Sequence, residues 1–402
     1  MTAPLRILDG IDVAGKRVVV RVDLNVPMKN GRVADDMRIR HVAPTLAELA
    51  DKRAIVIVLS HFERPGGRVI AEYSLAPLRP ALEQCLHRPV QFVATDWRNG
   101  LHRCAVAAAE PGDILLMDNT RFHPGEEKND PAFIRTLAGL GDIFVNDAFS
   151  AAHRAHASTE GIAHLLPSFA GRGMQAELSA LDRALGSPLR PVGAIVGGAK
   201  VSTKISLLEN LVKRVDDLVI GGGMANTFLH ARGLSVGRSI CEPQLGGLAE
   251  RILRQAEKHS CNIVLPRDAV VAREFAANAE HQTVDIGEVP EDAMILDIGP
   301  ETVADIKELF GDLRTLLWNG PVGAFETEPF DRGTSALAKA AARRTQSGTL
   351  QTIAGGGDTV AALSAAGVSN SFTYISTAGG AFLEWLEGRV LPGVDVLKTY
   401  QM

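Results

Sequence analysis

The sequence has few cysteines and lacks the features of a secreted or membrane-spanning chain. Its 402 residues include only Cys85, Cys104, Cys241 and Cys261, and none of these forms a C-x-x-C pair or has zinc-finger spacing. We therefore expect free thiols in a reducing compartment. The stretch MTAPLRILDG lacks the basic and apolar regions of a secretory signal, and no apolar run is long enough to span a membrane. These absences predict a cytoplasmic protein.

An excess of basic residues is also missing. The formal net charge is −5, whereas proteins that bind the phosphate backbone of nucleic acids usually carry a basic excess. Low-complexity segments and short repeats are absent as well. We therefore expect no nucleic-acid or membrane partner. The length allows two or three domains, each with a sizeable core.

Short β-branched runs alternate with amphipathic segments along the chain. Runs that are apolar on both faces are typical of parallel strands between layers of helices. The segment Phe169–Leu185 has helical spacing and is expected to be a connecting helix and a hinge if the domains move. The predicted strands are Arg17–Val22, Ala54–Leu59, Ile114–Met117, Asp142–Val145, Val192–Val196, Asp217–Ile220, Asn262–Leu265, Thr315–Trp318, Thr349–Ile353 and Phe372–Ile375.

The two halves differ in the residues that come directly after their strands. In the first half the strands end in arginine, histidine, asparagine and aspartate, and in the second half they end in glycine clusters. Ligands of α/β sheets bind beyond the carboxyl ends of the strands. The pattern therefore predicts a cationic domain and a glycine-rich domain that face one another.

The cationic strand ends predict an anion-binding site. Arginine binds phosphate or carboxylate oxygens in pairs, and loops at one sheet edge converge, although each arginine alone could be a surface residue. Asp23 and Asn25 alternate in RVDLNVP and suit a ligand hydroxyl or a structural turn. The cationic residues are Arg21, Arg38, His61, Arg64, Arg121, His153, Arg154 and His156.

The glycine clusters predict a phosphate-bearing ligand, most simply a nucleotide. Glycine turns allow close backbone approach and expose N–H groups to an anion. In AGGGDT, Asp358 could hold Mg²⁺ beside phosphates or cap the following helix. Glu326 could accept hydrogen bonds from ribose hydroxyls or be merely exposed.

GGAKVSTK, residues 197–204, places two lysines where a helix is expected to begin. Cations are unfavourable at a helix N-terminus, and like charges four residues apart repel. With Lys200 and Lys204 on one helical face, both ammonium groups would point back at the glycine turn. Together with bare N–H groups they would form a polyphosphate site.

Two common nucleotide motifs are not matched. In a Walker A loop, Ala199 would be glycine and Val201 would be serine or threonine. GGGMAN ends in Asn226 where a dinucleotide fingerprint has glycine. The second failure disfavours a nicotinamide-dependent dehydrogenase. A non-catalytic scaffold would need neither Lys200 nor Asp358 beside its glycine loops.

With these loops in view, the chain closely resembles the phosphoglycerate kinase family. The matching segments keep the family's order from residue 21 to about residue 388. They are RVDLNVP, DDMRIRHVAPTL, SHFERP, NTRFHPGEEKND, VNDAFSAAHRAHAST, GGAKVSTKI, VIGGGMANTF, DIGPET, LWNGPVGAFE, AGGGDT and STAGGAFLEWLEG.

The resemblance implies a glycolytic kinase with two Rossmann-like three-layer domains, parallel sheets and a hinge helix. It implies reversible transfer of the acyl phosphate of 1,3-bisphosphoglycerate to ADP, giving 3-phosphoglycerate and ATP, with Mg²⁺ and after domain closure. It further implies a monomer. The expected parts are a substrate domain (residues 1–168), a hinge (169–186), a nucleotide domain (187–386) and a tail packing back on the first domain (387–402).

The resemblance also assigns roles by motif. Asp23 and Asn25 would hold the glycerate hydroxyl region, and Arg38 would contact the carboxyl end and the phosphoryl group in flight. Lys200 would move with that group, and the backbone of residues 377–380, including Gly379 and Gly380, would face the transition state. The non-transferred phosphate would be gripped by His61, Arg64, Arg121 and Arg154. The nucleotide would be bound by Lys204, Asn319, Glu326, Gly356, Gly357, Asp358 and Thr359, with Asp358 handling the metal.

Two departures from the family pattern concern local geometry. Phe62 and Glu63 replace a Leu-Gly type pair and place a carboxylate beside the phosphate site. We expect the Glu63 carboxylate to face solvent. Ala378 stands where a glycine is common, and a positive φ there would be strained.

Overall fold

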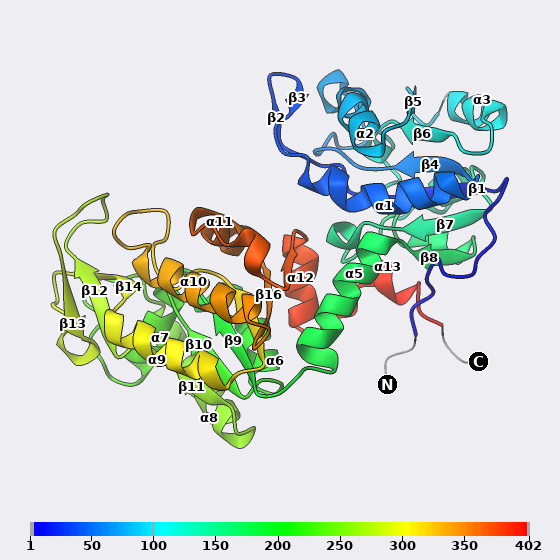
Figure 1. Ribbon diagram of the computed structural model, residues 1–402. Coiled ribbons are helices and arrows are strands. Elements are labelled where there is room, and N and C mark those ends of the chain that lie inside the picture. The colour runs from blue at the N-terminus through cyan, green and yellow to red at the C-terminus, as the bar shows by residue number, and fades with distance from the viewer. Residues whose placement is uncertain (1–3, 99, 400–402) are drawn as a thin grey trace. The chain divides into compact units, whose positions relative to one another are not determined.

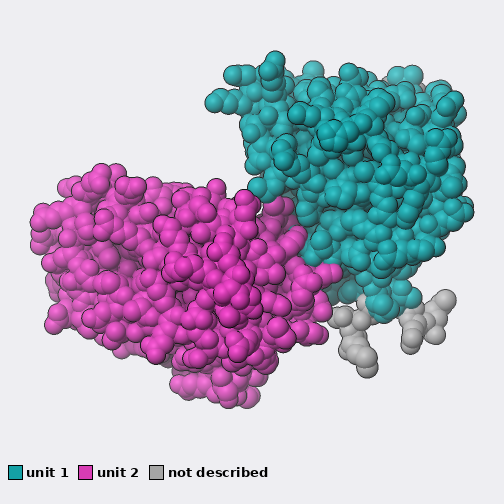
Figure 2. All heavy atoms as spheres, viewed as in Figure 1, with its two compact units in different colours: residues 1–178, 390–402 teal, residues 179–389 magenta. Residues whose placement is uncertain are grey.

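The computed structural model describes residues 4–98 and 100–399. The chain divides into two compact units. The first comprises residues 1–178 and 390–402, and the second comprises residues 179–389 (Figure 2).

The first unit is built on a six-stranded parallel sheet (Figure 1). Val20 at its centre pairs with Val58 on one side and Val145 on the other. Because both faces of these strands are buried, the predicted parallel layers are confirmed here. In spatial order the strands are β5 (Gln91–Val93), β6 (Ile114–Met117), β4 (Ile55–Leu59), β1 (Arg17–Arg21), β7 (Ile143–Asn146) and β8 (Ser168–Ala170).

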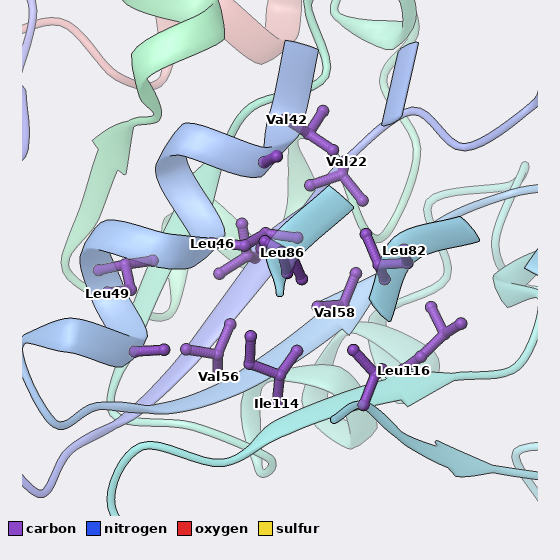
Figure 3. Packing of buried hydrophobic residues seen from close by; sticks show 14 of the residues in the cluster. Val22, Val42, Leu46, Leu49, Val56, Val58, Leu82, Leu86, Ile114 and Leu116 are labelled. Atoms are coloured by element: carbon purple, nitrogen blue, oxygen red, sulfur yellow. The ribbon is translucent and has the colours of Figure 1, made fainter. Parts of the chain in front are cut away.

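Helices cover both faces of this sheet. On one face lie α1 (Met37–Asp51) and α2 (Arg79–Leu86), and on the other lie α3 (Leu101–Ala108) and α4 (Pro131–Ala138). The alternation of side chains along each strand sends successive residues into two separate cores. Figure 3 shows the first core, where Val42, Leu46 and Leu49 of α1 and Leu82 and Leu86 of α2 meet Val56, Val58, Ile114 and Leu116 of the sheet.

The second unit repeats this design with another six-stranded parallel sheet. Leu316 pairs with Gly193 on one side and Thr352 on the other. The two sheets bring the carboxyl ends of their strands, and so the predicted site loops, to one edge of each unit. The spatial order is β11 (Asn262–Val264), β10 (Asp217–Ile220), β9 (Val192–Val196), β15 (Thr315–Asn319), β16 (Gln351–Gly355) and β17 (Tyr374–Ser376).

Two groups of helices flank the second sheet. The helices α9 (Pro300–Asp312), α10 (Arg332–Gln346) and α11 (Gly357–Ala365) contribute to one core around Trp318. The other helices described in this unit are α6 (Ile205–Leu211), α7 (Gly223–Ala231), α8 (Gly246–Lys258) and α12 (Gly379–Leu386).

Antiparallel pairings extend both units beyond the predicted strands. The second unit carries a small sheet of β13 (His281–Asp285), β12 (Asp268–Ala272) and β14 (Met294–Ile298). The first carries a hairpin of β2 (Met28–Lys29) and β3 (Arg32–Val33). The strands β2 and β3 were missed because each has only two residues, and β13 because its residues are largely exposed.

The connecting helix is shorter than its apolar spacing suggests. Ala170 pairs with Asn146 in the sheet, and the Gly171 amide donates to the Asn146 carbonyl at 2.9 Å. The helix α5 therefore spans Arg172–Leu181, with the Asp147 side chain accepting from the Met174 amide at 2.8 Å, and a π-helical turn, Asp182–Gly186, comes after it. The prediction of a helix from Phe169 is wrong for its first residues.

The C-terminal segment packs within the first unit. A short helix, α13 (Pro392–Asp395), brings the Gly393 amide to the Ala152 carbonyl at 2.8 Å. The Thr399 amide donates to the Pro4 carbonyl at 2.8 Å. Residues 1–3 of the predicted first domain and residues 400–402 of the predicted tail lie outside the described residues.

Candidate functional site

Four parallel strands of the first unit deliver its cationic side chains to one sheet edge. Asp23 and Asn25 come after β1, and His61 comes after β4. Arg121 lies beyond β6, while Arg154 lies beyond β7. The predicted convergence of these loops is therefore present.

Asp23 organises the residues after β1. Arg38 at the start of α1 donates from Nη1 to Asp23 Oδ2 at 2.9 Å and to the Asn25 carbonyl at 2.8 Å. Ser150 also donates to Asp23. The Asn25 amide donates to Asp23 Oδ1 at 2.9 Å. Arg38 is thus held beside Asp23 and Asn25, and its side chain is one-third exposed.

A cluster of positive charge lies around His61. Arg21 contacts His61 directly, and its Nη2 lies 2.9 Å from Nδ1 of the ring. The guanidinium of Arg121 is almost fully buried, and its Nη1 donates to the Glu63 carbonyl at 2.7 Å. Arg154 Nε lies 3.0 Å from His153 Nε2. Arg64 is exposed at the margin of this cluster.

The cluster disfavours any further positive charge. Burial lowers the pKa of His61 well below its usual range, and Arg21 adds to the shift. Burial together with Arg121 and Arg21 lowers the pKa of His156 to about 4. Both rings are therefore neutral near pH 7, and the arginines supply the positive charge that an anionic ligand would meet.

The departure at Phe62 and Glu63 does not obstruct this site. The Glu63 side chain is exposed, as expected, and its carboxylate forms no hydrogen bond or ion pair with a described residue. Its backbone contributes instead, because the carbonyl receives Arg121 and the amide donates to Asn25 Oδ1 at 3.1 Å. Glu63 has φ +51, a conformation that suits glycine and explains the family's usual residue there.

Glycine turns in the second unit are required by close backbone packing. A Cβ added at Gly197 would lie 1.8 Å from the Pro321 carbonyl oxygen. Gly356 has φ +101, and a Cβ there would lie 2.7 Å from Asn319 Nδ2. The loops after β9, β15 and β16 therefore pack against one another at the sheet edge.

The prediction that Lys200 and Lys204 share one helical face is wrong. Residues Val201–Thr203 form a 3₁₀ turn, and α6 begins only at Ile205. Lys200 precedes the turn in an extended conformation and is exposed. The Thr203 hydroxyl donates to the Lys200 carbonyl at 2.8 Å, which favours the turn over a continuous helix.

Lys204 points back into the glycine turn. Its ammonium group donates to the Gly197 carbonyl at 2.6 Å, and to Asn319 Oδ1 and the Asn319 carbonyl at 2.7 and 3.2 Å. Burial lowers the pKa of Lys204 to about 8, against the opposing effect of Asp358. Oxygen atoms of the protein therefore already offset the charge that seemed unbalanced in the sequence.

An apolar cavity of about 310 Å³ opens beside these turns. Its walls come from the glycine turns, the loop after β15 and the small antiparallel sheet. Such a mostly apolar pocket next to exposed backbone N–H groups suits a planar base with attached phosphates. The lining includes Gly198, Ala199, Gly222, Gly223, Ile240, Phe275, Leu296, Asp297, Pro321, Glu326 and Asp358.

The predicted polar residues lie around this cavity in different settings. Glu326 and Asp358 are exposed on its lining, and Asp358 occupies the first turn of α11. The Thr359 hydroxyl is buried, accepting from the Gly320 amide at 2.7 Å and donating to the Gly355 carbonyl at 2.9 Å. Asn319 Nδ2 donates to the Gly355 carbonyl at 2.7 Å. Thr359 and Asn319 therefore fix the turns.

A single carboxylate could hold a metal only with help from a ligand. Among residues 4–98 and 100–399, no group of three or more His, Cys, Asp or Glu side chains is placed to bind a metal ion. Asp358 alone suits Mg²⁺, which keeps several waters and is commonly bound by one carboxylate plus substrate phosphates. Its exposed position in the first turn of α11 leaves room for both.

The loop after β17 is unstrained at its unusual residue. Ala378 has φ −95 and caps α12, so the methyl group causes no conformational penalty. The Ala378 amide donates to Ser376 Oγ at 3.2 Å. Gly379 and Gly380 form the first turn of α12, where backbone N–H groups lack helical partners.

Several residues at these sites were not singled out by sequence reasoning. Ile240 and Phe275 line the cavity from distant segments, and both side chains are exposed. Asp297, in the motif DIGPET, lies at the cavity wall, and burial raises its pKa to about 8. Glu126 and Ser158 lie under the cationic cluster, and a single sequence carries no signal that pairs them.

No helix within the described ranges is long and apolar enough to cross a membrane. This finding agrees with the short apolar runs of the sequence.

Comparison with known proteins identifies the family. A family model described as phosphoglycerate kinase matches residues 8–389. The chain is 61% identical to phosphoglycerate kinase of Bradyrhizobium diazoefficiens over 99% of this chain and all of the relative. It is 62% identical to that of Agrobacterium fabrum over 96% and 97% of the two chains. The structure of the Coxiella burnetii phosphoglycerate kinase matches with a TM-score of 0.91 and 43% identity over 98% and 99% of the two chains. This chain belongs to the phosphoglycerate kinase family.

Proposed function

We propose that this protein transfers the acyl phosphate of 1,3-bisphosphoglycerate to ADP, reversibly, to give 3-phosphoglycerate and ATP. As a member of the family, it is a phosphotransferase with a carboxyl group as acceptor. One observation carries the proposal: the buried arginines Arg21 and Arg121 and the neutral histidine His61 come together at one sheet edge of the first unit. That combination suits a small anionic substrate.

We assign the glycerate ligand to the first unit. Arg38 already contacts Asp23 and the Asn25 carbonyl, so a glycerate hydroxyl and carboxyl end could be received there with little rearrangement. The buried guanidinium group of Arg121 and the exposed guanidinium group of Arg64 can each donate paired hydrogen bonds, which suits an oxygen-rich dianion. The residues proposed to bind the non-transferred phosphate are His61, Arg64, Arg121 and Arg154.

We assign the nucleotide to the second unit. The base would enter the apolar cavity, and Glu326 at its lining would accept hydrogen bonds from the ribose. Lys204 and the first turn of α11 would bind the phosphates, with Asn319 holding the turn. Gly356, Gly357, Asp358 and Thr359 make up that phosphate-binding segment, and Asp358 would hold Mg²⁺ together with the nucleotide.

The proposed chemistry needs positioning and charge stabilisation but no general base. The attacking carboxylate or phosphate oxygen is already ionised, so the two neutral histidines have no proton to remove. We propose that Arg38, Lys200 and the N–H groups at Gly379 and Gly380 stabilise the phosphoryl group in flight. Direct in-line transfer requires that the ligands of the two units meet, and we propose that domain closure brings them together.

A coupled assay with 3-phosphoglycerate and MgATP tests the activity. We expect ADP production that is abolished without Mg²⁺, and no production by folded protein would overturn the proposal. Arg38→Ala and Lys200→Ala should each lower kcat by roughly a hundredfold or more. Matched controls are Arg40→Ala, on the same helix and exposed, and Lys213→Ala, exposed beyond α6. Near-normal kcat in either site variant would contradict its assigned role.

We further propose that the protein acts as a monomer in the cytoplasm. The free cysteines among the described residues agree with a reducing compartment. Sedimentation equilibrium should give a mass near 42.9 kDa, and a concentration-dependent larger mass would contradict the monomer.

A further inference from the structure

Arg21 makes an unusual set of contacts at the end of β1. The side chain is only 1% exposed. Its Nε donates to Ser158 Oγ at 2.9 Å, Nη1 donates to the Val22 carbonyl, and Nη2 lies 2.9 Å from Nδ1 of His61. Arg21 is therefore enclosed by its partners and is not placed to bind substrate itself.

The contact between Arg21 and His61 fixes the direction of one hydrogen bond. A guanidinium group only donates and stays charged in proteins, so His61 Nδ1 must accept. An accepting ring nitrogen carries no hydrogen. The neutral ring of His61 must then carry its hydrogen on Nε2.

The surroundings of His61 keep the ring neutral. The cations Arg21, Arg121 and Arg154 oppose its protonation, and Asp23 acts in the other direction. Burial is the largest effect, and the pKa of His61 falls well below its usual range. Nε2 has no hydrogen-bond partner among the described residues and is not enclosed, so its hydrogen remains available to a ligand.

Two residues behind Arg21 hold it in this orientation. The single hydroxyl hydrogen of Ser158 is donated to Glu126 Oε1, which leaves the oxygen free to accept from Arg21. The Ser158 amide donates to Glu126 Oε2 at 3.1 Å, and Thr120 donates to Oε1 at 3.3 Å. Glu126 is fully buried and is a favourable charge partner for Arg21.

We propose that Arg21, held by Ser158 and Glu126, is a positioning residue that keeps His61 in its Nε2–H tautomer. His61 then presents a neutral hydrogen-bond donor to the non-transferred phosphate. This inference rests on the proposed placement of that phosphate beside His61. Arg21, which contacts the ring directly, then acts through His61, whereas Arg121 and Arg154 are proposed to bind the phosphate themselves.

The tautomer can be read in the free protein without any activity measurement. Two-bond ¹H–¹⁵N correlation spectra of histidine-labelled protein distinguish a protonated from an unprotonated ring nitrogen, and His61→Gln assigns the signal. We expect a hydrogen on Nε2, none on Nδ1 and no titration of His61 between pH 5.5 and pH 8. A hydrogen on Nδ1, or titration near pH 6.5 in the wild type, would overturn the inference.

Replacing Arg21 tests whether it is the cause. In Arg21→Met the donor is lost, so His61 should show a mixture of tautomers and a raised pKa. Arg21→Lys keeps a charged donor and should restore the wild-type tautomer. An unchanged tautomer in folded Arg21→Met would overturn the role of Arg21. If Arg21→Met does not fold, the wild-type spectrum still decides the tautomer. Ser158→Ala, which lacks the hydroxyl that orients Arg21, then replaces Arg21→Met as the test of the cause.

Two substitutions of His61 link the tautomer to substrate binding. Glutamine can place an amide nitrogen where Nε2 lies, whereas asparagine can place one only near Nδ1. We expect the KM for 3-phosphoglycerate to be at least tenfold lower in His61→Gln than in His61→Asn, and the two variants to have similar kcat values to one another. Equal KM values in folded variants would overturn the donor role. Absence of wild-type activity would instead refute the proposed function, since the spectra do not depend on turnover.

Discussion

Lys204 should take up a proton when a nucleotide binds to the second unit at alkaline pH. In the free protein its pKa is lowered to about 8 because the side chain is buried. The three oxygen contacts come from neutral groups, which cannot restore the pKa to its ordinary value near 10.4. A polyphosphate beside the ammonium group would favour the charged form and raise the pKa again.

Linkage between proton binding and nucleotide binding gives the expected proton uptake and the expected change of affinity with pH. Free Lys204 binds fewer protons than ordinary lysine between pH 8 and about pH 10.4, so charging it costs free energy in that window, and bound phosphate removes the cost. With a return to the ordinary pKa, binding at pH 8.5 should take up about 0.75 proton. Between pH 7.5 and pH 9.5 the affinity should fall about twentyfold, or about 2 kcal/mol.

Calorimetric titration of MgADP in two buffers of different ionisation enthalpy measures the proton uptake directly. The control is Lys204→Arg, because guanidinium does not deprotonate in this range, and its affinity should be independent of pH. Lys204→Met should show no uptake and weaker binding at every pH. Wild-type uptake equal to that of Lys204→Arg would refute the reasoning.

Three further outcomes are expected. Gly197→Ala should destabilise the protein by about 1–3 kcal/mol in urea unfolding and weaken MgADP binding in calorimetry, because its Cβ would lie 1.8 Å from the Pro321 carbonyl oxygen. The control is Gly247→Ala, which has open space around it and should change neither stability nor MgADP binding in this direction. Glu63→Gly should relieve the strain of φ +51, raise stability by up to about 1 kcal/mol and leave kcat unchanged; lower stability would contradict this. The pKa of His156 is lowered to about 4, so this side chain favours the folded state above pH 6.5 and loses that effect as the pH falls. Between pH 7 and pH 5 the free energy of unfolding of the wild type should therefore fall by about 1 kcal/mol more than that of His156→Gln, after allowance for partial exposure. Equal losses in the two proteins would refute the shift.

Parallel strands were the most predictable part of the fold. The runs Ile114–Met117, Val192–Val196 and Asp217–Ile220 match β6, β9 and β10 residue for residue. Each of these strands is buried on both faces, so a continuous apolar run identifies it. By contrast, β13 has exposed or half-buried residues throughout, and no apolar pattern distinguishes it from a loop.

The site was predictable where functional residues come directly after a strand, and less so where side chains meet across the fold. The sequence placed His61 and Arg121 at converging loops, because strand order alone brings them together. It could not bring Phe275 and Glu326 to one cavity, since the cavity they line depends on the small antiparallel sheet. It also misplaced Lys200, because the 3₁₀ turn depends on a local hydroxyl contact that competes with a helix.

The charge states at the two sites lead to one statement about the whole reaction. With a pKa of about 4, His156 is too weak a base to titrate near neutral pH, and His61 is likewise held neutral. The attacking oxygen needs no deprotonation, so neither histidine should produce an acidic limb in the rate profile between pH 5.5 and pH 7. Lys204 is different, because burial lowers its pKa to about 8. Above pH 7, kcat/KM for the nucleotide should therefore decline with rising pH as Lys204 loses its proton.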